Sequence, residues 1–372
     1  MKKVLLFTIL NFFVQSHPTK GTSNYSLEDA PIVIDIGAAK TDSLKTNYIR
    51  YIPLETTDDC LIGGINKVLI KNERIYVADF SRTASLFIFD LNGKFLFKIN
   101  KRGQGPGEYL VFGDFDIQTN GDIYIFDQHR QKFLIYSPDG KYIQEIKSDY
   151  IFIGFCLFRN KMYWSKFLEH GVMYANLAVY DMIDKKTDFL LTDKKYLDEL
   201  GIANYGNYDF YYSPDSIVYY SPKFSEIIFS IDKDGLHPAI GLKNLKKPSK
   251  DMIERFAQQG GGGSYKLQEH FFIENVNIYE TDKYITFAPR NMPTPWGYTL
   301  LYNKLTKTAC FIEDQNIGTH WINGSNGKYF FSVVQFRLDF NPSHKQIIDS
   351  REELKNWQED DNPVIVIFEP VN

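Results

Sequence analysis

The chain has 372 residues, of which 44% are hydrophobic, 16% aromatic and 24% charged. This hydrophobic content is enough for a folded core and excludes a disordered chain, and the many Phe and Tyr residues favour β-structure. The formal net charge of -4 gives no overall basic field, so nucleic acid is not an expected partner.

The N-terminus has the pattern of a secretory signal peptide. Lys2 and Lys3 are followed by a short apolar stretch over residues 4–14, and cleavage is expected after Ser16. This stretch is too short to span a bilayer, and no other segment approaches a span. No cysteine follows it to carry a lipid. We therefore expect an exported protein of the periplasm or cell surface, with no transmembrane span after signal removal.

An N-terminal extension is expected over residues 17–46, followed by a repeat-built domain over residues 47–372. Two copies of a strand, loop, strand, tight turn and strand pattern cover residues 74–95 and 122–142. Asn-Gly and Asp-Gly dipeptides mark their hairpin turns, because glycine supplies the positive φ that such turns need. Weaker copies begin near residues 162, 217, 284 and 329. Six units of this kind predict an all-β, six-bladed β-propeller with four antiparallel strands in each blade.

Closure of the ring is predicted by two unmatched segments. The sixth unit ends at residues 364–369 without an outermost strand, whereas Asn47–Leu54 precedes the first unit and belongs to none. An N-terminal strand that completes the last blade would remove an open sheet edge. We therefore expect Asn47–Leu54 to close the ring.

A family resemblance supports the same fold. The segments Arg102–Tyr109 (RGQGPGEY) and Tyr51–Thr56, with the repeated Ile-Tyr-x-x-Asp pattern, resemble the NHL-like six-bladed propeller family of exported bacterial proteins. The resemblance covers essentially the whole mature chain and is strongest over residues 51–147. It implies the fold and an exported location, with Glu108 as a structural tie between blades. It implies little about activity, because a shared fold does not fix a function.

The long segments are expected on one face of the ring. In a four-stranded blade, the a–b and c–d turns open on one face and the b–c and d–a loops on the other. The first set is short, and the insertions at 193–200, 249–264 and 337–362 all belong to the second. Helices are expected at 193–200, 250–259 and 351–359, the last with a capping box formed by Ser350 and Glu353. Elaborated loops predict that this long-loop face is the working face.

Basic, histidine and aromatic side chains recur in the b–c loops of that face. The candidate ligand-binding residues are Arg82, His129, Arg130, His170, Lys223, Arg290, Trp296 and Arg337. A ring of cations would attract anions, and arginine suits carboxylate, sulfate or phosphate groups. Alternatively, these cations form structural pairs with the aspartates that end the second strands, Asp79 and Asp127.

A metal site on the innermost strands is the other open alternative. Its candidate ligands are Asp114, Asn207, Glu274 and His320. Oxygen-rich ligands would suit Ca²⁺ or Mg²⁺ in a hydrolase, lactonase or lyase. However, the inner strand of the third blade offers no ligand, and neither GxSxG nor HExxH occurs. The sequence therefore favours a non-enzymatic binding propeller without a cofactor, whose partner is a glycan, a peptide or an envelope protein.

Three cysteines, Cys60, Cys156 and Cys310, leave at least one thiol free. Cys156 lies in the apolar run 151–158, where we expect a small buried side chain. No CxxC pair indicates a zinc or redox site.

Overall fold

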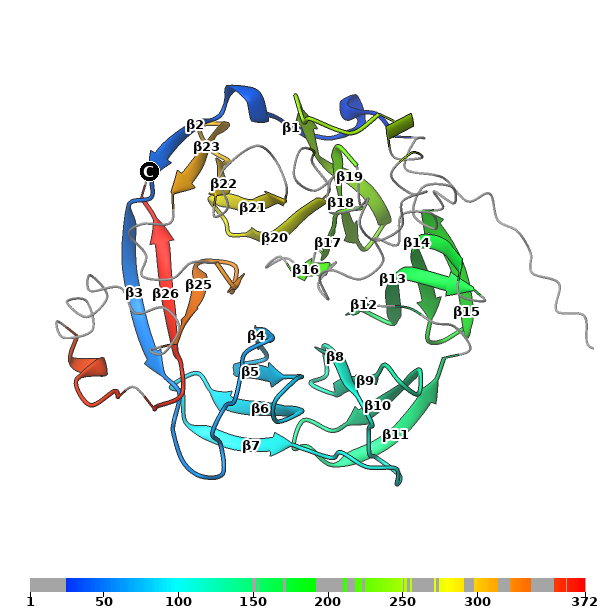
Figure 1. The fold of residues 1–372 in the computed structure, drawn as a ribbon, viewed down its shortest axis with the longest axis vertical. Coiled ribbons are helices and arrows are strands. Elements are labelled where there is room, and N and C mark those ends of the chain that lie inside the picture. Colours follow the sequence, from blue (N-terminus) through cyan, green and yellow to red (C-terminus); the bar gives the residue numbers. More distant parts are fainter. Residues whose placement is uncertain are drawn as a thin grey trace, which may run out of the picture.

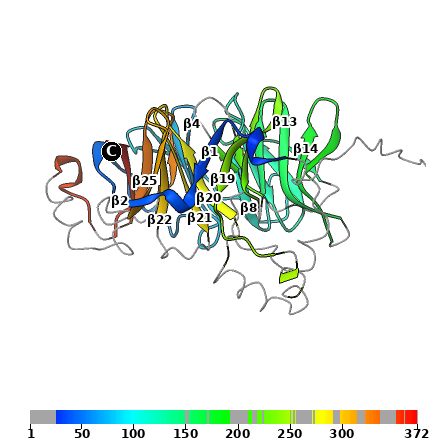
Figure 2. The same cartoon turned by 90° about the horizontal axis from the view of Figure 1, so that it is seen from above.

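The chain forms a closed ring of six β-sheets around a central axis (Figure 1). The computed structural model describes residues 25–148, 152, 154–169, 172–191, 210–212, 218–222, 225–249, 251–252, 255, 271, 274–290, 298–313, 322–335, 351–358 and 360–371. Seen edge-on in Figure 2, the sheets stand side by side across a flattened body. The predicted six-bladed β-propeller is confirmed. Over these described ranges, no helix has the length and apolar character needed to cross a membrane.

Each blade contains four antiparallel strands, which are named below in order from the axis outward. Blades 1 and 2 consist of β4 (Lys67–Lys71), β5 (Arg74–Asp79), β6 (Ser85–Asp90) and β7 (Phe95–Ile99), then β8 (Phe112–Ile117), β9 (Ile123–Asp127), β10 (Lys132–Tyr136) and β11 (Tyr142–Lys147). Blades 3 and 4 consist of β12 (Gly154–Phe158), β13 (Lys161–Glu169), β14 (Val172–Asp181) and β15 (Lys186–Leu191), then β16 (Phe210–Tyr212), β17 (Val218–Tyr220), β18 (Ile227–Asp232) and β19 (Gly235–Lys243). Blades 5 and 6 consist of β20 (Glu274–Glu280), β21 (Tyr284–Arg290), β22 (Tyr298–Asn303) and β23 (Thr308–Glu313), then β24 (Gly324–Ser325), β25 (Phe330–Val334), β26 (Val364–Pro370) and β3 (Thr46–Pro53).

The ring is closed by the N-terminal strand β3, as predicted. It pairs antiparallel with β26, with Ile52 opposite Ile365. Asn362, just before β26, reinforces this closure because its side chain accepts from the Ile62 N–H at 2.9 Å and donates to the carbonyl of Glu55 at 2.7 Å. The first and last segments of the propeller are therefore joined by both a strand ladder and a buried amide.

The hydrophobic core is divided among the spaces between neighbouring blades. Strands β9 and β10 are buried along their whole length, because each sheet is covered by a blade on both sides. One cluster joins blades 1 and 2 through side chains such as Tyr76 and Phe115, and another joins blades 2 and 3 through Phe126 and Phe155. This arrangement explains the high aromatic content, since large flat side chains fill the wedge-shaped gaps.

The N-terminal extension adds strands that the sequence did not predict. Residues 25–45, here called the N-terminal strap, follow the outside of blades 4 and 5 (Figure 1). Within it, β1 (Ile32–Asp35) pairs parallel to β19, and β2 (Lys40–Ser43) pairs parallel to β23. Short 3-10 turns, η2 (Leu27–Asp29) and η3 (Ile36–Ala38), precede and follow β1. Blades 4 and 5 therefore carry a fifth, outermost strand.

The helix predicted over 351–359 is reduced to a single 3-10 turn, η5 (Glu352–Leu354), so that prediction is wrong in length. Arg351 occupies its N-cap without a side-chain hydrogen bond, and Ser350 lies outside the described residues. The indole of Trp357 donates to the carbonyl of Asn362 at 2.8 Å, which turns the chain back toward β26. The segment 193–200 and most of 250–259 also lie outside the described ranges.

All three cysteines are free, and Cys156 is buried as predicted. Burial raises the pKa of the Cys156 thiol well above its usual value, so it stays protonated and unreactive. We expect Cys60 and Cys156 to resist 5,5'-dithiobis(2-nitrobenzoic acid) in the native protein. Unfolding without reductant should release three titratable thiols per chain. A smaller number would reveal a disulfide and contradict the structure.

Candidate functional site

A cavity of about 790 Å³ lies at the axis, and all six blades contribute to its wall. It follows β4 from Asn66 to Asn72 and reaches the a–b turns of other blades at Gln118, Arg159 and Asn326. These turns belong to the face that carries the short connections. The cavity therefore reaches the face opposite the predicted long-loop face, a location that differs from the expected one.

The first charged pair of the cavity links blades 1 and 2. Lys67 Nζ lies 2.8 Å from Asp114 Oδ1 and donates to the carbonyl of Phe115, also at 2.8 Å. The backbone N–H of Phe115 donates to the same carboxylate oxygen. Burial raises the pKa of Asp114, whereas the nearby ammonium of Lys67 opposes that shift. Asp114 is thus held as an acceptor between two blades.

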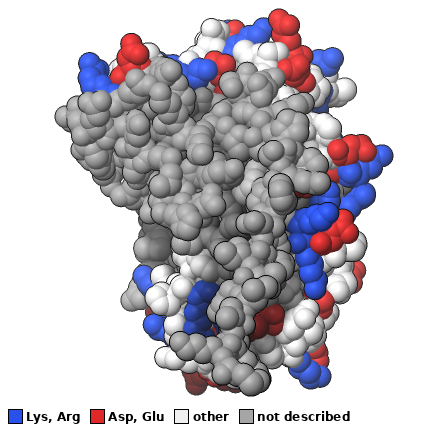
Figure 3. Space-filling model, turned by 90° about the vertical axis from the view of Figure 1, so that its right-hand side faces the viewer, with Lys and Arg blue, Asp and Glu red and all other residues white. Residues whose placement is uncertain are grey.

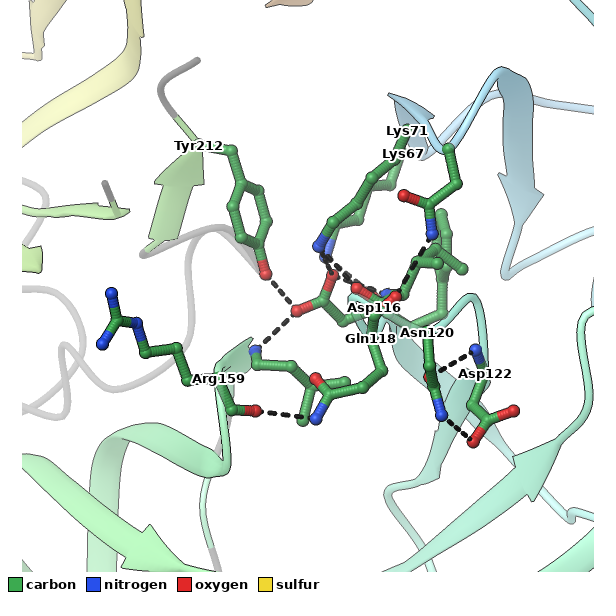
Figure 4. Close-up of polar contacts among 12 residues, drawn as sticks. Lys67, Lys71, Asp116, Gln118, Asn120, Asp122, Arg159 and Tyr212 are labelled. Carbon is green, nitrogen blue, oxygen red and sulfur yellow. Dashed lines mark hydrogen bonds and ion pairs between the residues drawn. The ribbon is translucent and has the colours of Figure 1, made fainter. Parts of the chain in front are cut away.

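The second charged group, Asp116, receives donors from three other blades (Figure 4). Its Oδ2 accepts the backbone N–H of Leu157 in blade 3 at 2.6 Å and the hydroxyl of Tyr212 in blade 4. Its Oδ1 lies 3.7 Å from Lys71 Nζ of blade 1. Burial, and next the negative charge of Asp116, raise the pKa of Tyr212 well above its usual value. The tyrosine therefore remains protonated and donates a hydrogen bond to the carboxylate.

Both ion pairs present their cationic ends to the cavity. The side chains of Lys67 and Lys71 are 11% and 27% exposed, whereas those of Asp114 and Asp116 are 2% and 0% exposed. Lys71 Nζ also lies 4.7 Å from the ring centroid of Tyr212. The carboxylates sit behind the lysines, so the wall of the cavity is its positive side.

Arg159 adds a third cation to this wall. Its guanidinium lies 5.6 Å from the ring centroid of Phe158, and its carbonyl accepts the Gln118 side-chain amide at 2.7 Å. Across the described parts of the chain, no carboxylate lies within ion-pair distance of this guanidinium. In Figure 4 it points away from the network around Asp116. Arg159 thus lines the cavity with its charge uncompensated by a neighbouring carboxylate of the described chain.

The residues of the predicted long-loop rim are organised differently. Asp79 accepts the backbone N–H groups of Arg82 and Thr83, while Arg82 Nη1 donates to the carbonyl of Gly63 at 2.7 Å. Asp127 likewise accepts the backbone N–H groups of its own loop. The two aspartates therefore hold loop backbone rather than arginine side chains.

The other rim residues are only partly described. His129 is exposed and Arg130 is half-buried beside the loop that Asp127 holds. Arg290 ends β21, but its side chain is not described. His170, Lys223, Trp296 and Arg337 lie outside the described ranges.

Comparison with known proteins identifies the family. The domain of unknown function DUF4934 matches residues 31–369. The chain belongs to this family. The match begins one residue before β1, so both strands of the N-terminal strap are part of the DUF4934 propeller.

Solved structures similar to this DUF4934 propeller share its fold. One is an exported protein of Bacteroides fragilis (BF0058), with a TM-score of 0.73 and 17% identity, covering 91% of this chain and 100% of that chain. Another is a DUF4221 family member from Bacteroides vulgatus, with a TM-score of 0.54 and 11% identity, covering 89% of this chain and 99% of that chain. No curated protein matches the chain. At these identities the likeness shows the fold alone.

The glycine-rich segment of the DUF4934 propeller forms a fixed crossover between blades 1 and 2. Glu108 Oε2 accepts the Gly105 N–H at 2.7 Å, so this carboxylate occupies the place that a bound anion would take. Tyr109 donates its hydroxyl to the carbonyl of Ala84 at 2.6 Å, and Tyr136 donates to that of Gly107 at 2.7 Å. The blades are therefore tied by the two tyrosines, while Glu108 holds the crossover itself.

Only one of the four predicted metal ligands, Asp114, has a described side chain. Asp114 does not fit the role because Lys67 holds its Oδ1, and a cation would have to displace an ammonium group. Glu274 begins β20 without a described side chain, and Asn207 and His320 fall outside the described ranges. Where the chain is described, no cluster of three or more His, Cys, Asp or Glu side chains could hold an ion.

Of the charged side chains around the cavity, only Asp114 was singled out from the sequence, and then as a metal ligand. Asp116, Lys67 and Lys71 were missed, although a signal was present. Asp114 and Asp116 alternate within the apolar strand β8, and Lys67 and Lys71 are four residues apart in β4. Since side chains alternate with a period of two, each pair lies on one face of its strand. Arg159 and Tyr212 carried no comparable signal.

Proposed function

We propose that this propeller is an exported binding protein that holds a small polar ligand in its axial cavity. The observation that carries the proposal is the cavity itself, whose volume of about 790 Å³ lies within the usual range for small-molecule sites. All six blades contribute to its wall, which combines charged and amide side chains with aromatic and aliphatic ones. This mixture supports binding of a hydroxylated molecule with apolar faces more than of a purely apolar one.

Export is part of the same proposal. The basic and apolar start of the sequence supports a secretory signal, and the similar Bacteroides fragilis protein is named as exported. A periplasmic or surface location would give the cavity access to glycans, peptides or envelope proteins. The NHL-like resemblance supports the same placement among exported propellers.

Blocking the mouth of the cavity tests the proposal. Thr119 is exposed and lines the cavity, so Thr119→Trp should fill the mouth without disturbing the core. We expect the wild type to bind at least one member of a panel of soluble oligosaccharides and short peptides in isothermal titration calorimetry. Thr119→Trp should abolish that binding.

The matched control is Leu305→Trp, which adds a ring on the same face but away from the cavity. Leu305 is 88% exposed in the c–d turn of blade 5. This variant should bind as the wild type does. Binding that survives Thr119→Trp, or a wild type that binds no member of the panel, would overturn the proposal.

A further inference from the structure

We infer that the ligand of the axial cavity carries an oxyanion group, which the guanidinium of Arg159 binds, on a hydroxylated, sugar-like body. The inference deepens the proposed function and rests on it. It assigns a chemical class to the ligand and a specificity-determining role to Arg159.

The first argument is the direction of the two buried ion pairs. The lysines face the cavity and the aspartates lie behind them, so each pair presents its positive end to a ligand. A fixed array of this kind favours anions even where the total charge of the pairs is zero. Figure 3, by contrast, shows basic and acidic side chains interspersed on one outer side of the molecule. The cavity therefore differs in charge from that described outer surface.

The second argument is that the backbone of Arg159 is held in place, whereas its guanidinium has no carboxylate partner among the described residues. The Gln118 side chain holds its carbonyl, and its guanidinium lies near the ring of Phe158. The planar guanidinium can donate two parallel hydrogen bonds to a carboxylate, a sulfate or a phosphate. Lys67 and Lys71 are already engaged by aspartates, whereas neither Arg159 nor Lys233, the other lysine or arginine side chains of the described wall, has a carboxylate of the described chain within ion-pair distance. Of these two, only Arg159 has the planar guanidinium that suits an oxyanion.

The third argument concerns the rest of the wall. The described lining includes the amide side chains of Asn72, Asn277 and Asn326, which can both donate and accept hydrogen bonds. The aromatic residues Phe210 and Tyr212 lie among them. Amides and aromatic rings together suit the hydroxyl groups and the apolar faces of a sugar. Asp232 also lines the cavity, but its Oδ1 lies 3.5 Å from His237 Nε2.

The experiment compares matched saccharides by isothermal titration calorimetry. The probes are a galacturonic acid trisaccharide, the neutral galactose trisaccharide, a sulfated galactose trisaccharide and inorganic phosphate. We expect an acidic saccharide to bind at least about tenfold more tightly than the neutral one, because hydrogen bonds to charged groups are the stronger kind. Added NaCl should weaken that preference. The uronic acid, sulfate and phosphate arms identify which oxyanion is bound.

Substitutions then locate the anion. Arg159→Gln should reduce affinity for the acidic probe about tenfold or more and leave affinity for the neutral probe unchanged. Arg159→Lys should lose less affinity for the acidic probe, because it keeps the positive charge. It should still bind more weakly than the wild type, because lysine lacks the planar guanidinium. Arg50→Gln removes an exposed arginine of β3 on the outside of blade 6 and should bind as the wild type does. Arg159 is itself exposed, so we expect its variants to melt near the wild-type temperature.

The outcomes separate this inference from the proposed function. If the neutral saccharide binds as tightly as the acidic one and Thr119→Trp abolishes both, the cavity binds ligand but the inference is wrong. If no probe binds, the inference is overturned, and the wider panel still decides the proposed function. If affinity for the acidic probe falls only in Arg130→Gln, the anion binds on the long-loop rim. That result would overturn both the inference and the proposed function.

Discussion

Asp116→Ala is expected to lower the free energy of unfolding by about 3–5 kcal/mol, because it breaks a buried charged network. Asp116 is completely buried and accepts from Leu157 and Tyr212, with Lys71 close by. Its removal would leave the Leu157 N–H and the Tyr212 hydroxyl without their shared acceptor, and the partly exposed Lys71 ammonium without its carboxylate. These donors come from blades 1, 3 and 4, so the substitution acts on the packing of four blades at once.

Urea unfolding followed by tryptophan fluorescence measures this effect. Tyr212→Phe removes a single donor from the same network and should cost about 1–2 kcal/mol. It provides a measurable variant if Asp116→Ala fails to fold. The control is Asp139→Ala, an exposed aspartate in the c–d turn of the same blade. Its unfolding midpoint should shift much less than that of Asp116→Ala, because its contacts with Ser137 and Lys141 are exposed to solvent. An Asp116→Ala midpoint equal to that of the wild type would show that the network does not hold the blades together.

The fold could be predicted because its signals are local and repeated. Gly93 shows why the turn dipeptides were informative. Its φ of +83° requires glycine, and an added Cβ would lie 2.2 Å from the carbonyl oxygen of Pro53. The residue that makes the hairpin turn also allows the closing strand to approach blade 1. The hairpin turn and the closure of the ring therefore both require glycine at this position.

The candidate site could be predicted only in part, because its contacts join residues far apart in the chain. The alternation of Asp114 and Asp116 was visible in the sequence, but their partners were not. Lys71, Leu157 and Tyr212 meet Asp116 only when the innermost strands converge at the axis. The sequence pointed instead to cations at equivalent positions of the repeats. In the structure, the best described of these, Arg82, donates to loop backbone.

The N-terminal strap escaped prediction for a different reason. Strand β1 has four residues, of which only Ile34 is buried, and β2 has none that are buried. Neither segment contains enough alternation to indicate a strand by itself. Their conformation comes from the exposed edges of β19 and β23, which offer unpaired backbone groups to any neighbouring extended segment. Such a strand is specified by its partner more than by its own sequence.

Ile34→Ala therefore tests whether the strap is part of the folded unit, and we expect it to cost about 2–4 kcal/mol. Ile34 is 3% exposed and packs with Ile240 and Phe311 in the core between blades 4 and 5. Truncation would leave a cavity in that core and weaken the contact that holds β1 against β19. The measurement is again urea unfolding, with limited proteolysis to detect cleavage within the strap.

Val33→Ala is the matched control, since Val33 is the preceding residue of the same strand and is 41% exposed. Both substitutions keep the backbone pairing of β1 and shorten an aliphatic side chain, so their difference reports burial rather than strand propensity. We expect Val33→Ala to stay within about 0.5 kcal/mol of the wild type. Equal effects of the two substitutions would mean that the strap lies on the blades without contributing to their core. A selective effect of Ile34→Ala would mean that the propeller needs residues before its closing strand, and that its stable unit begins at the strap.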